Sequence, residues 1–139
     1  MKIEIRYFSK TGNTKKIAQA ISLITETPAK SIEDSVIEAD ILFLGGALYA
    51  GKINKDLQNF IESLDNKKIK KVVIFSTTMG SESAYKELKK YLDKKKITVL
   101  ENNYHCRGKF LFFQRSRPDE RDIENAKEFA KEILEGEKK

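Results

Sequence analysis

A chain of 139 residues is long enough for one domain with a single hydrophobic core and leaves little room for a second. Charged residues make up 35% and hydrophobic residues 40%, the balance of a globular protein, and no apolar run approaches the length of a membrane span. The formal net charge is +6, but the basic residues are spread along the chain without a basic-aromatic motif, so we expect neither a membrane nor nucleic acid as a partner.

The first predicted elements are a strand at residues 3–8 and a helix that begins near residue 14. The strand is rich in β-favouring side chains, and the helix carries apolar residues at helical spacing from Ile17 to Ile24. The loop between them consists of Ser9, Lys10, Thr11, Gly12, Asn13 and Thr14. Hydroxyl groups, a glycine and the N–H groups of a helix N-terminus together favour a phosphate site at this junction.

The number and spacing of glycines in this loop distinguish it from other nucleotide-binding loops. The loops that bind nucleoside triphosphates and dinucleotides contain more than one glycine, whereas this loop has only Gly12. A nucleoside-triphosphate site and a dinucleotide site are therefore both disfavoured. Hydroxyl and amide side chains also cap helices, and a loop that only starts a helix therefore stays an alternative.

The remaining predicted elements alternate between strands and helices. Strands are expected at residues 29–32, 39–44, 72–75 and 97–100, the last of them extended or re-formed around residues 110–113. Helices are expected at residues 54–64, around residues 84–92, and from Pro118 through residue 134. Because right-handed crossovers place helices on both faces of such a sheet, this alternation predicts a single α/β domain over residues 1–139. We expect five parallel strands in the order 2-1-3-4-5.

The loop at residues 9–14 matches in full the Ser/Thr-x-Thr-Gly-x-Thr pattern of flavodoxins, and the chain resembles that family over essentially its whole length. Residues 104–110 and 117–122 add supporting similarity. The resemblance implies a flavodoxin-like three-layer sandwich that binds FMN, with the pattern wrapped around the terminal phosphate. It also implies an electron-transfer protein that shuttles electrons between redox partners. The alternative is an FMN-dependent oxidoreductase of the protoporphyrinogen or quinone dehydrogenase type.

The resemblance further implies two loops that hold the flavin ring. The first consists of Ala47, Leu48, Tyr49, Ala50 and Gly51, with Tyr49 as the stacking ring. The second consists of Thr77, Thr78, Met79 and Gly80, which would present backbone amides and carbonyls to the pyrimidine edge. The residues alone leave two alternatives open. Tyr49 would instead pack under the helix at 54–64, and the second loop would cap the helix that follows through Ser81.

Basic residues are expected at the edge of the sheet where the flavin would lie. They are Lys10, Lys52, Lys55, Arg107 and Lys109. A basic mouth would steer an acidic redox partner protein or a carboxylate-bearing substrate to the site.

The single cysteine and histidine are neighbours, Cys106 and His105. They exclude a disulfide within the chain and a structural zinc site. On an extended strand their side chains point to opposite faces, so we expect a buried thiol and no catalytic pair. No secretory signal precedes the first strand, and we expect the cytoplasm as the location.

One non-redox class shares the expected topology. A response-regulator receiver needs an acidic cluster after the first strand and an aspartate that ends the third. Phe8-Ser9 and Leu44-Gly45 stand at those places, which disfavours a receiver.

Overall fold

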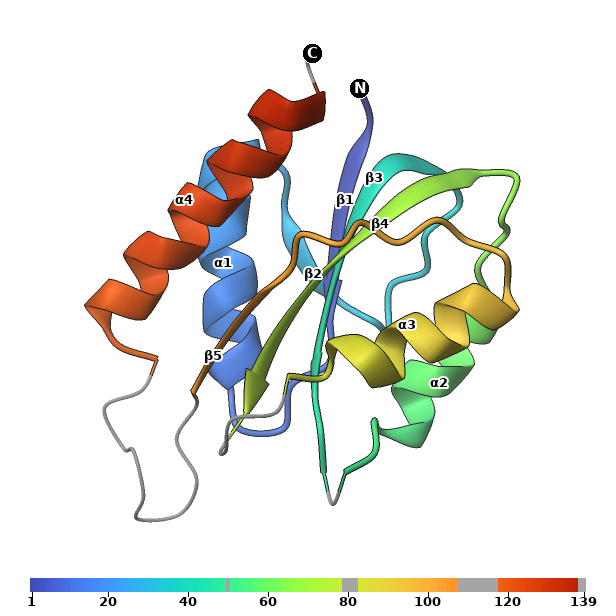
Figure 1. Ribbon diagram of the computed structural model, residues 1–139, viewed down its shortest axis with the longest axis horizontal. Coiled ribbons are helices and arrows are strands. Elements are labelled where there is room, and N and C mark those ends of the chain that lie inside the picture. Colours follow the sequence, from blue (N-terminus) through green and yellow to red (C-terminus); the bar gives the residue numbers. More distant parts are fainter. Residues whose placement is uncertain (50, 79–82, 108–117, 138–139) are drawn as a thin grey trace.

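The computed structural model describes residues 1–49, 51–78, 83–107 and 118–137. Its five parallel strands form one sheet in the order β2-β1-β3-β4-β5, which confirms the predicted topology (Figure 1). The strands are β1 (Ile3–Tyr7), β2 (Ala29–Ser31), β3 (Ala39–Ala47), β4 (Ile69–Thr78) and β5 (Tyr104–Arg107). The helices are α1 (Asn13–Thr25), α2 (Lys55–Glu62), α3 (Tyr85–Lys94) and α4 (Glu120–Glu137).

Three layers result, because helices cover both faces of the sheet. Helices α1 and α4 lie on one face, and α2 and α3 lie on the other (Figure 1). Successive residues of a strand point to opposite faces. In β3, Ile41 and Phe43 therefore join the core under α1 and α4, while Leu42 and Leu44 join the core under α2 and α3. This explains why the central strands read as continuous apolar runs.

The central strands are longer than the sequence pattern indicates. Pairing between β3 and β4 continues to Ala47 and Thr77 at the carboxyl edge of the sheet. Gly45 and Gly46 therefore lie inside β3 and not in a loop. A Cβ atom at Gly45 would lie 2.1 Å from the Phe75 ring, so packing between neighbouring strands requires glycine there.

The fifth strand is displaced from the predicted position. Residues 97–100 make only an isolated parallel bridge, between Val99 and Val72, and the strand itself begins at Tyr104. Tyr104 packs against Phe129 of α4, with ring centroids 5.7 Å apart, which is a tertiary contact that local pattern does not report. The alternative position at residues 110–113 lies outside the described residues.

None of the described helices combines the length and the apolar composition that crossing a membrane requires.

Candidate functional site

The carboxyl edge of the sheet is the place where a ligand is expected. The connection after β1 leads to α1 on one face, and the connection after β3 leads to α2 on the other face. Because β1 and β3 are neighbours, the loops that follow them diverge and flank a topological switch point. Residues 8–12 form the first loop, and the second loop spans 48–54, of which residue 50 is not described. With the first turn of α1, they contain most of the residues that the sequence singles out.

The loop after β1 is built around a left-handed glycine. Gly12 is the N-cap of α1 with φ of +90°, a conformation that L side chains rarely adopt. Its N–H donates to Ser9 Oγ at 3.0 Å, and its carbonyl accepts from the Lys16 N–H at 3.1 Å. Gly12 has no side chain that could cap the helix, so the N–H groups of the first turn face the loop without a capping oxygen from that position.

The chemistry of this loop suits an anion. The N-terminus of α1, a 13-residue helix, carries the positive end of the helix dipole. The Thr11 side chain is exposed beside it and the Ser9 side chain is half-buried, so both hydroxyls can reach a ligand. The N–H groups and hydroxyls are hydrogen-bond donors of the kind that phosphate oxygens accept.

A buried hydroxyl pair ties the start of α1 to the end of β4. Thr14 Oγ1 and Thr77 Oγ1 lie 2.8 Å apart, and their residues are only 1% and 3% exposed. The Thr77 hydroxyl therefore bonds to α1, while Ser81, through which the second loop would cap α3, lies outside the described residues. The bridge fixes the start of α1 relative to the end of β4.

The loop after β3 turns sharply at Tyr49. The Tyr49 N–H donates to the Lys52 carbonyl at 2.7 Å, and the Lys52 N–H donates to the Tyr49 carbonyl at 3.1 Å. Gly51, between these two residues, has a φ of +77°. Lys10 Nζ lies 4.5 Å from the centroid of the Tyr49 ring, a cation–π contact that joins the two loops. Phe8 meets the same ring edge to face at 6.5 Å.

The Tyr49 ring is therefore fixed at the centre of the site by its contacts with Lys10 and Phe8. Burial raises the pKa of Tyr49 above its ordinary value of 10.0, against an opposing effect of a hydrogen bond with the Lys10 backbone. The phenol therefore stays neutral at physiological pH. Lys10 and Phe8 both contact the Tyr49 ring and hold it between the two loops.

The other residues singled out from the sequence are distributed as follows. Ala47 is buried at the end of β3, Leu48 is half-buried, and Thr78 ends β4 with its side chain half-buried. Asn13 and Thr14 are buried in the first turn of α1. Ala50, Met79 and Gly80 lie outside the described residues. The structure thus brings residues 9–14 together with Tyr49 and Thr77.

A cavity of about 430 Å³ adjoins the Tyr49 loop on the side of α3. Its lining includes Leu48, Gly51, Tyr85, Asn103 and His105. The Tyr85 hydroxyl donates to the Leu100 carbonyl at 3.2 Å, which fixes one wall. Tyr85 and Asn103 were not predicted from the sequence as residues of this region, because their approach to the loop after β3 depends on how α3 and β5 dock.

His105 and Cys106 point to opposite faces, as predicted. Cys106 is buried in the core under α1 and α4, while His105 is exposed and lines the cavity beside α3. Within the described part of the chain, no group of three or more His, Cys, Asp and Glu residues is placed to hold a metal ion.

Phe8 is a site residue that the sequence pattern did not predict as one. It follows β1 directly, donates its N–H to the Gly45 carbonyl at 3.0 Å and packs on Tyr49. Its position one residue before Ser9 was the available signal.

Comparisons with known proteins identify the family of the chain. The model of the flavodoxin domain family matches residues 4–112. An uncharacterized protein of Methanocaldococcus jannaschii is 33% identical over 136 residues, covering 88% of this chain and 90% of its own length.

Two solved structures illustrate the likeness in fold. A flavodoxin from the domain Archaea superposes with a TM-score of 0.78 at 20% identity, covering 100% of both chains. A flavoprotein from Lactobacillus acidophilus, solved in complex with FMN, gives a TM-score of 0.61 at 16% identity over 76% of this chain and 92% of its own. At these identities the likeness establishes the fold.

Proposed function

Because this chain belongs to the flavodoxin family, we propose that it binds FMN at the carboxyl edge of the sheet and carries electrons between redox partners in the cytoplasm. The observation that carries the proposal is the contact of Lys10 with the Tyr49 ring, 4.5 Å from Nζ to the centroid. This contact joins the loop at residues 9–14, whose donors suit an anion, to the aromatic ring of Tyr49. A mononucleotide with a phosphate at one end and a flat ring at the other needs both.

FMN, when bound, supplies the redox chemistry, and the chain's residues bind and orient it. Ser9, Thr11 and the first turn of α1 would bind the phosphate through hydroxyl and N–H donors. Tyr49 would stack on the ring and keep water from one of its faces. The Thr14–Thr77 bridge would hold the phosphate loop in register with β4, where the second ring loop begins.

The first experiment compares FMN with riboflavin, which has the same ring and no phosphate. Apo protein is titrated with each flavin and binding is followed by flavin fluorescence. We expect Thr11→Ala to weaken FMN binding roughly tenfold, the worth of a hydrogen bond to a charged group, and to leave riboflavin binding unchanged. Tyr49→Leu should weaken the binding of both FMN and riboflavin. Thr98→Ala, an exposed threonine remote from the site, is the control. If neither flavin binds, the proposal is wrong.

A second candidate function is suggested by the cavity of about 430 Å³ between Leu48, Gly51 and His105. An electron carrier needs no room for a substrate, whereas an FMN-dependent oxidoreductase that acts on a quinone or another small molecule does. Steady-state assays of the FMN-loaded protein with NADH and menadione distinguish the two. Multiple turnovers without a second protein favour the oxidoreductase, and a single reduction that needs a partner protein for reoxidation favours the carrier.

A further inference from the structure

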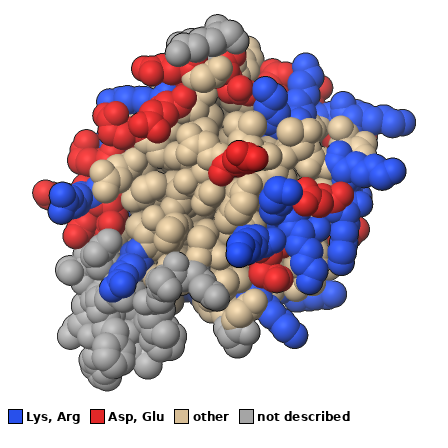
Figure 2. All heavy atoms as spheres, viewed as in Figure 1, with Lys and Arg blue, Asp and Glu red and all other residues tan. Residues whose placement is uncertain are grey.

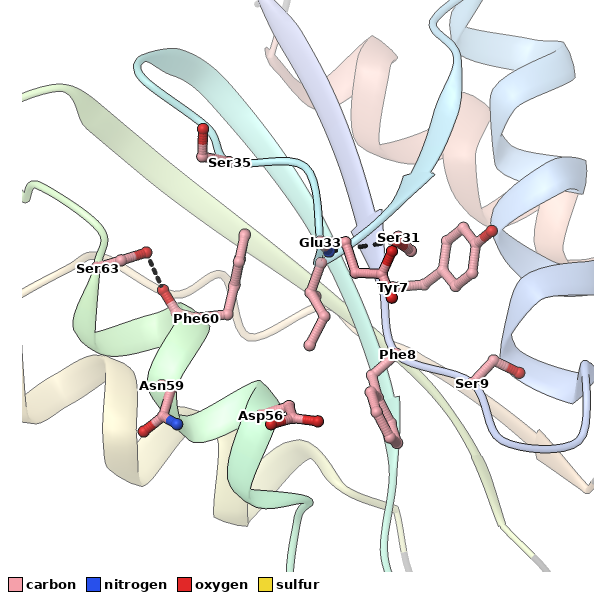
Figure 3. A pocket seen from close by; sticks show the side chains of 11 residues that line it. Tyr7, Phe8, Ser9, Ser31, Glu33, Ser35, Asp56, Asn59, Phe60 and Ser63 are labelled. Carbon is pink, nitrogen blue, oxygen red and sulfur yellow. Dashed lines mark hydrogen bonds between the residues drawn. The ribbon is translucent and has the colours of Figure 1, made fainter.

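A second cavity, of about 420 Å³, lies on the α2 side of the sheet, behind the phosphate loop (Figure 3). Three separate segments enclose it: the end of β1, the connection from β2 to β3, and α2. Its lining consists of Tyr7, Phe8, Ser9, Ser31, Ile32, Glu33, Ser35, Asp56, Asn59, Phe60 and Ser63. The volume falls in the range of small-molecule sites, about 300–1,000 Å³.

The inner wall of the cavity is apolar and continuous with the core. Phe60 of α2 is only 6% exposed, and Phe8 and Ile32 pack against the same core cluster. Two phenylalanine rings and an isoleucine offer a planar apolar group both stacking area and burial. The wall therefore fits an aromatic ligand body.

The outer wall is rigid because a buried arginine supports it. Arg6 is 3% exposed and donates to the Asp34 carbonyl at 2.8 Å and to the Ser35 carbonyl at 3.0 Å. Its charge is paired with Glu4 at 2.9 Å. The connection between β2 and β3 is thus held in place from beneath, and Arg6 is not one of the lining residues.

The charge of the cavity is opposite to that of the chain. Glu33 and Asp56 line it, no lysine or arginine does, and neither carboxylate is part of an ion pair among the described residues. The Asp56 carboxylate extends from α2 toward the Phe8 ring (Figure 3). In a chain with a net charge of +6, this is a local anionic site beside an aromatic wall.

Two serine hydroxyls at the rim already form hydrogen bonds within the chain. Ser63 Oγ donates to the Phe60 carbonyl at 2.6 Å, so its oxygen keeps only accepting capacity. Ser31 Oγ accepts from the Glu33 N–H at 3.2 Å and has a second lone pair. The Glu33 and Asp56 carboxylates only accept, whereas Ser31, Ser35 and Asn59 also carry donors, so the carboxylates are the groups that select a donor in the ligand.

We propose that this cavity binds a small organic cation, a primary ammonium or amidinium group carried on a body of one or two aromatic rings. The rings contact Phe8, Ile32 and Phe60, and the cation lies between Glu33 and Asp56. This inference does not depend on FMN binding, since the cavity borders the loop at residues 9–14 through Ser9, and Lys10 and Tyr49 do not line it.

The test uses three probes with the same rings and different charges: 2-naphthylmethylammonium, 2-naphthylmethanol and 2-naphthoate. Each is titrated into the ¹⁵N-labelled full chain with excess FMN, so that a ring cannot occupy the flavin site. We expect amide shifts at residues 32–35 and 56–63. The ammonium probe should bind roughly three- to fivefold more tightly than the alcohol, as a half-exposed ion pair allows, and the carboxylate least tightly.

Matched variants separate the local charge from the overall charge. Asp56→Asn should remove most of the preference for the ammonium probe. Glu62→Gln removes an exposed charge from the same helix outside this cavity and should leave the preference intact. Equal binding of the three probes, equal effects of the two substitutions, or shifts confined to other residues would overturn the proposal. Failure of FMN to bind would leave these shifts readable and would count only against the proposed function.

Discussion

Gly45 was expected in a ligand-binding loop, but it lies in β3, where it is required for packing against the neighbouring strand. Its α-carbon faces the Phe75 ring of the neighbouring strand, and a built Cβ would come within 2.1 Å of that ring. Ring atoms of a fully buried phenylalanine cannot move aside cheaply, because the core around them is close-packed.

We therefore expect Gly45→Ala to lower the free energy of unfolding by about 1–3 kcal/mol, the usual cost of overpacking. Gly136→Ala is the matched control. Gly136 lies in α4 with open space around it, and alanine there should stabilise the helix by about 0.5–1 kcal/mol. Urea unfolding of the three proteins measures both effects. Equal stabilities for Gly45→Ala and the wild type would contradict the packing argument.

Asp40 is a second residue whose surroundings have a measurable consequence. The Lys2 N–H donates to its carboxylate at 2.6 Å, and Lys70 Nζ lies 3.1 Å from it. The Lys2 hydrogen bond, and after it Lys70, hold the pKa of Asp40 below its ordinary value of 3.8. A carboxyl group with a lowered pKa stabilises the fold above the unfolded value and loses that contribution as pH falls through the folded value.

The corresponding prediction concerns the acid limb of the stability profile. Asp40→Asn should flatten the fall in unfolding free energy below pH 3.8. Lys70→Gln should flatten it less, because the Lys2 hydrogen bond remains. Denaturant unfolding across acid pH measures the slopes. Parallel profiles for Asp40→Asn and the wild type below pH 3.8 would show that Asp40 is not responsible.

At the scale of elements, the hydroxyl bridge between α1 and β4 positions the loop at residues 9–14. Thr14 and Thr77 are almost fully buried and each is the other's partner at 2.8 Å. Replacing one of them with valine leaves the other hydroxyl buried without its partner, whereas replacing both removes the need for the bond.

We expect Thr14→Val and Thr77→Val each to lower the unfolding free energy by about 1–3 kcal/mol, and the double variant to lose less than the sum. Thermal and urea unfolding give the three values. Both single variants should also weaken FMN binding, because α1 is no longer fixed against β4. Additive losses in the double variant would show that the two hydroxyls act independently.

At the scale of the whole molecule, charge is distributed unevenly. Acidic side chains gather over α4 and basic side chains over the side of α2 and α3 (Figure 2). At the carboxyl edge, Lys10, Lys52, Lys55 and Arg107 are all exposed, while Lys109 lies outside the described residues. The proposed flavin site thus has a basic mouth, and the anionic cavity lies next to it.

This distribution predicts which electron acceptors the FMN-loaded protein prefers. Reduced protein should react faster with ferricyanide, an anion, at low salt than at high salt, and hexaammineruthenium(III), a cation, should show the opposite trend. Lys52→Gln should slow the ferricyanide reaction roughly twofold at low salt. Lys68→Gln, which removes an exposed charge at the opposite edge of the sheet, is the control. Stopped-flow rates that are indifferent to salt would contradict electrostatic steering.

The strand order and the loop at residues 9–14 follow from the sequence alone, and each has a local physical cause. Alternating strand and helix patterns permit few arrangements once crossovers are right-handed, and the order β2-β1-β3-β4-β5 is the one observed. Gly12 takes up the left-handed conformation that a tight turn before a helix requires. The opposite orientations of His105 and Cys106 follow from the two-residue period of a strand.

Only the tertiary structure decided where β5 lies, how far β3 and β4 extend, and which side chains meet at Tyr49. Tyr104 begins β5 because it packs on Phe129, 25 residues further along the chain. The contact of Lys10 with Tyr49 and the bridge from Thr14 to Thr77 join segments that are distant in sequence. Local patterns encode backbone preference and burial, whereas such contacts exist only after the layers have packed.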